Sequence, residues 1–274
     1  MLLSRRSAIK GLLTTTVGAL TGATTYGVAF ERHQLAVTSA SLPVSGLPPA
    51  LDGLRIALLT DIHHSRTVPA DDVARAVQLA LAEQPDLIVL GGDYVTFGDR
   101  AFVGPVAELL APLRAPHGVF AILGNHDDDR DMPAALAGNH IEVLKDARTR
   151  IEVRGEGLEL AGVRFWTRRV ADVARVLRHA GDTVILLAHD PRRLTEASAL
   201  NVPAVLSGHT HGGQVVLPGV GAVARRRFPV LAGLGSRENT SIFVSRGIGT
   251  VYVPMRINCP PEVAIVTLKR RSQI

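Results

Sequence analysis

Residues 54–93 read LRIALLTDIHHSRTVPADDVARAVQLALAEQPDLIVLGGD, and this stretch decides the fold class. Two short apolar runs, 54–60 and 86–92, have the length and composition of buried strands. Between them, residues 71–83 repeat apolar side chains at helical spacing and begin with two aspartates, which the helix dipole favours in a first turn. A strand, a helix and a second strand in this order predict an α/β core.

The remainder of the chain continues this alternation. Further strands are predicted at 118–124, 183–189, 203–208, 214–217, 241–246 and 262–268, and further helices at 101–113 and 170–180. Residues 140–165 have the pattern of a meander of short strands, and residues 31–50 are expected to be irregular. Because no internal repeat or linker divides the chain, we expect one domain over residues 41–274.

Residues 1–40 are expected to be a targeting segment and linker. Arg5, Arg6 and one lysine precede residues 11–30, which carry no charge, and this order is typical of an export signal. The paired arginines resemble a twin-arginine signal, although Ala8 stands where that pattern prefers phenylalanine. We therefore expect the twin-arginine export machinery as a partner and the periplasm or cell envelope as the location. Residues 11–30 are rich in Gly and Thr, so cleavage and retention as a membrane anchor both stay open.

Composition excludes several classes of protein. The 274 residues are 46% apolar and 20% charged, so the chain can bury a core. A single cysteine, Cys259, excludes an intramolecular disulfide and a thiolate-rich metal cage. Without the three basic residues of segment 1–30, the body holds 27 basic and 25 acidic residues. A nearly neutral body with 4% aromatic residues has no signature of a nucleic-acid-binding protein.

Five apolar runs end in groups of Asp, His and Asn side chains. These groups are Asp61-Ile62-His63, Gly91-Gly92-Asp93, Gly124-Asn125-His126-Asp127, His189-Asp190 and Gly208-His209-Thr210-His211. Ligands of α/β sheets bind beyond the carboxyl ends of the strands, so we expect the five groups to converge. Oxygen and imidazole ligands suit Mn, Fe or Zn. Seven ligand candidates are too many for one four-coordinate ion and fit two ions that share a carboxylate.

This ordered set of motifs resembles the calcineurin-like metallophosphoesterases over about residues 54–268. Three longer strings resemble the bacterial branch that is often twin-arginine exported or membrane-anchored: PDLIVLGGDYVT (85–96), GHTHGGQVVLP (208–218) and RGIGTVYVPMRINCPPE (246–262). The resemblance implies a four-layer α-β-β-α sandwich, in which two mixed sheets face each other and helices cover the outer faces. It also implies hydrolysis of a phosphomonoester or phosphodiester by a metal-bridged hydroxide.

The resemblance further implies a role for each motif residue. One divalent ion would be held by Asp61, His63 and His211, a second by Asn125, His189 and His209, and both by the bridging carboxylate of Asp93. His126 would protonate the leaving oxygen, and Asp127 would orient His126. Mn²⁺ is the favoured metal, with Fe and Zn²⁺ as alternatives, because twin-arginine export allows loading before the folded chain leaves the cytoplasm.

Two other functions stay open. A pyrophosphatase of the UDP-2,3-diacylglucosamine type, or another lipid-linked phosphohydrolase, would use the same ligands, because loops rather than metals select the substrate. A non-catalytic metal-binding envelope protein would require a missing ligand or proton donor, and the motifs lack neither. Because one metal core serves monoesters, diesters and pyrophosphates, the sequence leaves the natural substrate open.

Several residues near the motifs have weaker patterns. We expect a pocket-rim role without metal for His64, substrate contact or packing for Tyr94, a structural role for Cys259, support of the site by Arg256 and Asn258, a solvated or anion-binding loop at Arg225–Arg227, and surface positions for His33, His117, His140 and His179.

Overall fold

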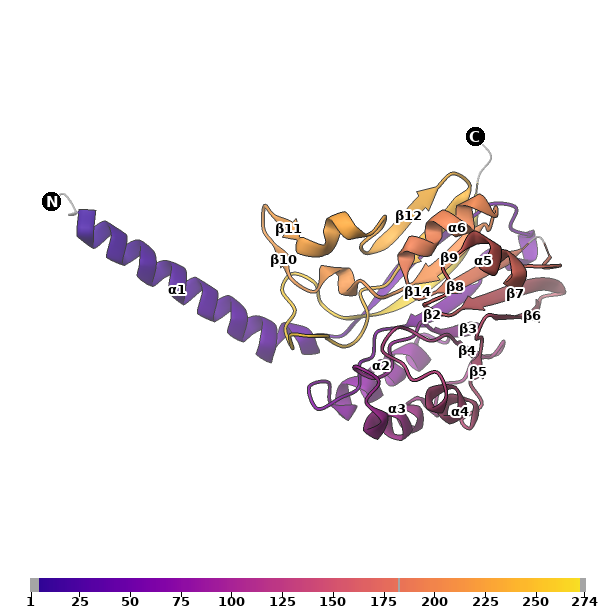
Figure 1. Cartoon of the computed structure of the whole chain (residues 1–274), viewed down its shortest axis with the longest axis horizontal. Helices are drawn as coiled ribbons and strands as arrows, with labels where there is room; N and C mark the ends of the chain where they lie inside the picture. Colours follow the sequence, from indigo (N-terminus) through magenta and orange to yellow (C-terminus); the bar gives the residue numbers. More distant parts are fainter. Residues whose placement is uncertain (1–4, 182, 272–274) are drawn as a thin grey trace.

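Two mixed sheets lie face to face in the computed structural model, which describes residues 5–181 and 183–271 (Figure 1). The first sheet has the order β1 (Ala36–Val44), β14 (Glu262–Arg270), β2 (Arg55–Leu59), β3 (Leu87–Leu90), β4 (Val119–Ala121), β5 (Glu142–Val143). The second has the order β12 (Gly233–Arg237), β13 (Thr240–Val244), β9 (Ala204–Ser207), β8 (Val184–Ala188), β7 (Glu156–Val163), β6 (Ala147–Val153). Strands β2 to β5 run parallel, as do β7, β8, β9 and β13.

Helices cover the outer faces of both sheets and complete four layers. The first sheet is covered by α2 (Ala70–Ala82), α3 (Val103–Leu110) and α4 (Asp131–Ala137), and the second by α5 (Val170–Val176) and α6 (Leu194–Ala199). Strand β2 shows how alternation serves two layers, because Ile56 and Leu58 pack between the sheets while Ala57 and Leu59 pack against helices. The predicted α-β-β-α sandwich is confirmed.

Shorter elements connect these layers. They are the 3₁₀ helices η1 (Glu31–His33), η2 (Pro49–Leu51), η3 (Arg100–Phe102), η4 (Pro191–Arg193), η5 (His211–Gly213) and η6 (Val223–Arg227), and a two-stranded hairpin of β10 (Val216–Leu217) and β11 (Gly221–Ala222). The predicted meander at 140–165 is divided between the two sheets, since β5 joins the first and the β6–β7 hairpin joins the second.

The prediction that residues 31–50 are irregular was wrong. Residues 36–44 form β1, which pairs in parallel with β14 from Ala36 opposite Glu262 to Val44 opposite Arg270. The small and polar side chains of this edge strand conceal it in the sequence, and its partner lies more than 200 residues away. The predicted boundary at residue 41 therefore falls inside a strand, and the domain begins by Ala36. The sequence also missed α4, α6 and β12.

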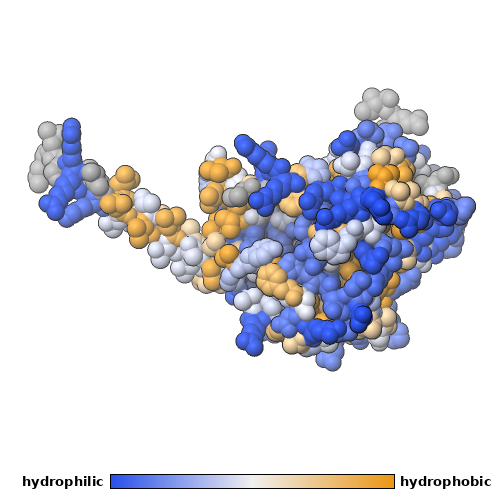
Figure 2. All heavy atoms as spheres, in the orientation of Figure 1, coloured by the Kyte–Doolittle hydropathy of each residue, from blue (hydrophilic) through white to orange (hydrophobic). Residues whose placement is uncertain are grey.

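Helix α1 (Arg5–Ala29) projects from the body as a single exposed helix, with its basic end farthest away (Figures 1 and 2). The first residue of the predicted export motif, Ser4, lies outside the described residues. The C-terminal end of α1 contacts the body, because the Gly27 carbonyl accepts a hydrogen bond from the Arg256 amide at 3.2 Å. Within residues 5–181 and 183–271, no helix combines the length and apolarity needed to cross a membrane.

Candidate metal centre

The predicted site residues lie on loops that follow five parallel strands. Asp61 and His63 follow β2, Asp93 follows β3, Asn125 follows β4, His189 follows β8, and His209 and His211 follow β9. Five of these seven have a positive φ, which turns the chain sharply at the strand end: Asp61 (53°), His63 (51°), Asp93 (57°), His209 (72°) and His211 (52°). This backbone is unfavourable for residues with side chains, and such strain concentrates at functional sites.

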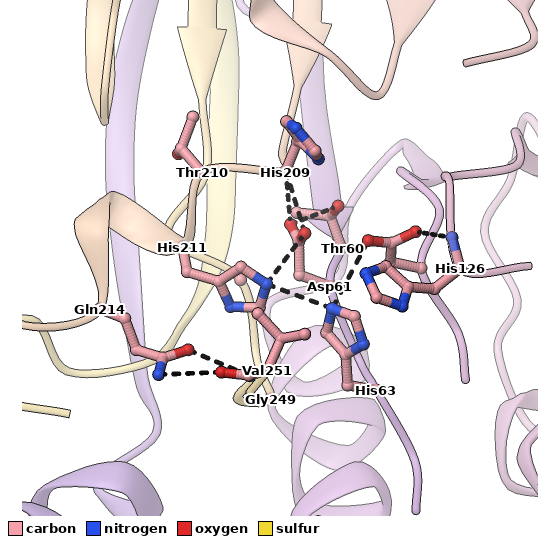
Figure 3. Close-up of polar contacts among 12 residues, drawn as sticks. Thr60, Asp61, His63, His126, His209, Thr210, His211, Gln214, Gly249 and Val251 are labelled. Carbon is pink, nitrogen blue, oxygen red and sulfur yellow. Dashed lines mark hydrogen bonds and ion pairs between the residues drawn. The ribbon is translucent and has the colours of Figure 1, made fainter. Parts of the chain in front are cut away.

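Asp61, His63 and His211 form the first group of ligand atoms, shown in Figure 3. Their ligand atoms all lie within 4.8 Å of one another, and the three side chains are buried. Nε2 of His211 is 3.2 Å from Nε2 of His63 and 3.4 Å from Oδ1 of Asp61. Two imidazole nitrogens that face each other beside a carboxylate have the arrangement that a cation between them would require.

Asp93, His189 and His209 form the second group, with the same limit of 4.8 Å. Nε2 of His189 is 3.1 Å from Oδ2 of Asp93, and that oxygen is also 3.5 Å from Nε2 of His63 in the first group. Asp93 therefore lies between the two groups. In the part of the chain that the structure describes, the buried Oδ1 of Asn125 has no hydrogen-bond partner.

Hydrogen bonds aim ring nitrogens at the centre. Nδ1 of His189 lies 2.7 Å from the carbonyl oxygen of Gly91, to which it must donate, so in the neutral ring the lone pair is on Nε2. Nδ1 of His63 lies 3.3 Å from the Thr96 hydroxyl, which leaves its Nε2 toward Asp93. Two carboxylates, four imidazoles and one amide oxygen suit Mn, Fe or Zn, so the residues fit the predicted pair of divalent ions.

Burial and nearby charges shift the pKa values of these groups. Burial raises the pKa of Asp61 to about 6 and lowers the pKa of His63 and of His209 to about 4, so both rings are neutral and able to ligate at neutral pH. Burial opposes protonation of His189, but the carboxylates of Asp93 and Asp61 outweigh it and raise its pKa to about 10. A divalent cation would compete with that proton for Asp93.

Two glycines allow the loops to approach one another closely. A Cβ at Gly124 would overlap the carboxylate of Asp93, and a Cβ at Gly208 would overlap Thr60 and the carboxylate of Asp61. The close approach of the loops also allows a backbone amide to reach a ligand, since the His209 amide donates to both carboxylate oxygens of Asp61 at 3.0 Å. The carboxylates are therefore fixed by the backbone of neighbouring loops.

Arg256 supports the first group from behind. Its guanidinium is fully buried and donates to the carbonyls of Gly249 at 2.6 Å, Arg246 at 2.8 Å and Cys259 at 3.0 Å. The Gly249 amide in turn donates to the carbonyl of Asp61 at 2.7 Å. The geometry thus agrees with the expectation that Arg256 supports the site.

Asp127 does not have the contacts expected of a residue that orients His126. Its carboxylate accepts hydrogen bonds from the amides of Asp93 and Tyr94 at 2.7 Å and of Gly124 at 2.8 Å. Burial and the charge of Asp93 raise its pKa to about 7, although the amide donors act in the opposite direction. Asp127 therefore ties the loop after β4 to the loop after β3.

His126 is held by backbone contacts and borders the first group. Its amide donates to Oδ1 of Asp93 at 2.9 Å, and its ring centroid lies 4.9 Å from that of His63 (Figure 3). The Phe97 amide donates to Nδ1 at 2.9 Å. An amide can only donate, so Nδ1 is unprotonated and Nε2 carries the proton of the neutral ring.

Comparison with known proteins identifies the family. A sequence model described as "Calcineurin-like phosphoesterase" matches residues 54–213. The chain belongs to this family. A metallophosphoesterase of Bacillus subtilis, YkuE, is 31% identical over 97% of this chain and 98% of its own length. Phosphodiesterase YaeI of Escherichia coli is 34% identical over 78% and 82%, and a metallophosphoesterase of Aquifex aeolicus is 34% identical over 88% and 95%.

Membership makes this chain a metal-dependent phosphoester hydrolase. Family relationship and the two ligand groups together indicate a dinuclear metal site.

The weaker predictions near this calcineurin-like centre have mixed outcomes. His64 is buried and its Nδ1 lies 3.0 Å from the Val68 carbonyl, so the expected position at a pocket rim was wrong. Tyr94 packs inside the core, where its hydroxyl donates to the Ile122 carbonyl at 2.9 Å. Cys259 is buried with Sγ 3.2 Å from the His211 carbonyl, and Asn258 contacts the β10 backbone instead of the ligands.

The remaining two weaker predictions concern exposed segments. Arg225, Arg226 and Arg227 are exposed. His33 was expected at the surface without a partner, but it is half-buried and its Nδ1 lies 2.8 Å from Oδ2 of Asp72.

Sequence reasoning missed the aromatic rim of the phosphoesterase site. Phe97 and Tyr252 lie beside His126, with ring centroids 5.0 Å and 6.3 Å from its ring. Gln214, three residues after His211, holds the loop that carries Tyr252. Only the position of Phe97 four residues after Asp93 could have suggested one of them, because the other contacts join distant loops.

Proposed function

We propose that this chain hydrolyses a phosphodiester or phosphomonoester at two divalent ions held by Asp61, His63, Asp93, Asn125, His189, His209 and His211. The observation that carries the proposal is the position of Asp93, whose Oδ2 lies near His63 of one ligand group and His189 of the other. The similarity to the phosphodiesterase YaeI of Escherichia coli favours the diester.

When bound, the two ions would supply the charge that binds phosphate oxygens and the acidity that activates the attacking water. The residues of the chain would orient the ester around them. Asp93 would bridge the ions, and the rigid amide contacts to Asp61 would keep the first site in place. Preorganised charges of this kind stabilise the charge that develops on the phosphoryl oxygens.

His126 would act on the leaving oxygen. Its Nδ1 is occupied by the Phe97 amide, so the proton on Nε2 is the one available to the substrate. A hydrogen bond or proton from Nε2 would stabilise the negative charge on the departing alcohol oxygen. Asp127 would act indirectly, since it fixes the amides of Asp93 and Tyr94.

We further propose that the protein is exported by the twin-arginine machinery and acts in the periplasm or cell envelope, with Mn²⁺ as the favoured metal. The paired arginines Arg5 and Arg6 at the exposed start of α1 support export by this machinery. The uncharged part of α1 after Lys10, most of which is exposed, would bring the enzyme to a membrane surface if the segment is retained. Oxygen-rich and imidazole-rich donors support Mn²⁺ or Fe over softer metals.

The test is a substrate panel with the full chain stripped of metal and then reconstituted with Mn²⁺, Fe²⁺ or Zn²⁺. We expect close to two ions per chain, hydrolysis of bis(p-nitrophenyl) phosphate, and loss of activity in EDTA that metal restores. A UDP-linked lipid pyrophosphate in the same panel separates the lipid-linked phosphohydrolase. Full activity in EDTA without bound metal would overturn the metal centre, and two bound ions without any hydrolysis would favour a non-catalytic protein.

A further inference from the structure

Two exposed aromatic rings stand together beside His126. Phe97 is 67% exposed and Tyr252 is 78% exposed. Their ring centroids are 5.6 Å apart, and they lie 5.0 Å and 6.3 Å from the His126 ring. The pair therefore presents apolar surface directly next to the side chain assigned to the leaving oxygen.

Both rings are carried by a strained backbone. Phe97 has φ of 53° and Tyr252 has φ of 62°, in the left-handed region that is unfavourable for bulky side chains. Exposed rings gain little from burial, so the hydrophobic effect does not offset this strain.

Hydrogen bonds fix the Phe97 loop to His126. The Phe97 amide donates to Nδ1 of His126 at 2.9 Å, and the Gly98 amide donates to the His126 carbonyl at 2.8 Å. The backbone that carries the Phe97 ring is therefore tied to His126.

Gln214 fixes the Tyr252 loop to the first ligand group. Its side-chain amide donates to the carbonyls of Val251 at 3.2 Å and Val253 at 2.8 Å, and its oxygen accepts from the Val251 amide at 3.0 Å (Figure 3). Gln214 also belongs to the sharp turn after His211, where its backbone N–H donates to the His211 carbonyl at 2.9 Å. The loop on each side of Tyr252 is thus tied to a ligand candidate.

The opposite rim of the site has a different chemistry. The ring centroid of Phe165 lies 5.2 Å from that of His209, and the Arg168 guanidinium lies over the Phe165 ring, 5.1 Å from its centroid. Arg192 lies 5.4 Å over the ring of Phe228, which is 5.5 Å from His209. Cations accompany the aromatic rings on this side, which suits the polar or anionic part of a substrate.

We propose that Phe97 and Tyr252 form a subsite for an apolar group, aryl or alkyl, attached to the leaving oxygen of the substrate. The proposal rests on the proposed function, because His126 defines which ester oxygen leaves. Two rings held apart from the core offer contact area to such a group, whereas a polar alcohol would gain little there. Because His126 defines the leaving side and the cations Arg168 and Arg192 lie on the His209 side, the proposal includes a direction in which the ester binds.

The test compares phenyl, hexyl and glyceryl esters of methyl phosphate with the metal-reconstituted full chain. Phe97→Gly and Tyr252→Gly remove each ring, while glycine accepts the positive φ and keeps the backbone amide. We expect each variant to lower kcat/KM for the phenyl and hexyl esters about tenfold, mainly through KM, and to leave the glyceryl ester within about twofold. Loss on the phenyl ester alone would assign ring stacking, and equal loss on both would assign general apolar contact.

Binding and unfolding measurements separate this role from a structural one. Calorimetry should show tighter binding of phenylphosphonate than of methylphosphonate, and the Gly variants should abolish the difference. Their unfolding temperatures should stay level or rise, because glycine relieves the strain. Val253→Ala, in the same loop and 49% exposed, is the matched control and should change none of these readouts.

The outcomes distinguish the two proposals. An equal loss on all three esters, or equal binding of the two phosphonates by the unaltered chain, would overturn the subsite. If the chain hydrolyses none of the esters, the proposed function fails, while a preference for phenylphosphonate that Phe97→Gly abolishes would still support the apolar subsite.

Discussion

Asp127→Asn tests whether this carboxylate holds the loops or orients His126. Oδ2 of Asp127 accepts two amides, from Asp93 and Gly124, and Oδ1 accepts the Tyr94 amide. An asparagine can keep its oxygen toward the first two amides, but its NH₂ group then faces the Tyr94 N–H. One donor loses its acceptor and meets a second donor.

The expected cost follows from the count of unsatisfied donors. A buried donor without a partner costs about 1–3 kcal/mol. Asp127 is half-buried, so water reaches part of the site and the lower part of that range applies, about 1–2 kcal/mol. A domain of this size loses about 2–4 °C of unfolding temperature per kcal/mol, so Asp127→Asn should lower it by about 2–8 °C. Asp127→Ala removes both acceptor oxygens, leaves all three amides without their partner and should lower the free energy of unfolding two to three times as much.

Unfolding is best measured in urea and by heating, with metal removed from every sample, because bound ions would stabilise the folded state unequally. His126→Asn, which keeps the backbone contacts of its loop, is the matched control. If the free energy of unfolding of Asp127→Asn stays within about 0.5 kcal/mol of that of the unaltered chain, the loop-holding role is wrong. A large loss of turnover with an unchanged free energy of unfolding would instead support the role of Asp127 in orienting His126.

Three further predictions concern the metal centre and the export signal. Asp93→Ala should reduce turnover more than any other ligand substitution, since one carboxylate serves both groups. Elemental analysis should show fewer than two ions per chain. Retention of both ions with near-normal turnover would contradict the bridging role. His126→Ala should keep both ions and lower turnover by about 10²–10⁴, more for an alkyl ester than for a nitrophenyl ester, whose leaving group needs no proton; an equal loss would argue for contact with the phosphate alone. Replacing Arg5 and Arg6 by lysine should leave the protein in the cytoplasm, as cell fractionation would show, whereas normal delivery would point to a general secretory signal.

The sequence by itself determined where several strands and helices lie and which polar groups follow the strands. The short apolar run at 54–60 predicted a buried strand, which is β2, and the amphipathic pattern at 71–83 predicted α2 within one residue at each end. Asp61 and His211, far apart in the chain, were predicted to converge because both follow apolar runs expected to be strands, and in the fold these strands, β2 and β9, belong to the two facing sheets. These features are readable because each depends on a local pattern and one general rule of sheet topology.

Tertiary structure decided what depends on contacts between distant loops. Strand β1 exists because β14 supplies its partner, and its own residues carry no strand pattern. Asp127 looks like the partner of His126 in the sequence, yet the amides nearest to its carboxylate belong to another loop. Phe97 and Tyr252 are unremarkable exposed residues until folding places their rings 5.6 Å apart beside His126. Spacing along the chain records none of these contacts, since each forms only when separate loops pack against one another.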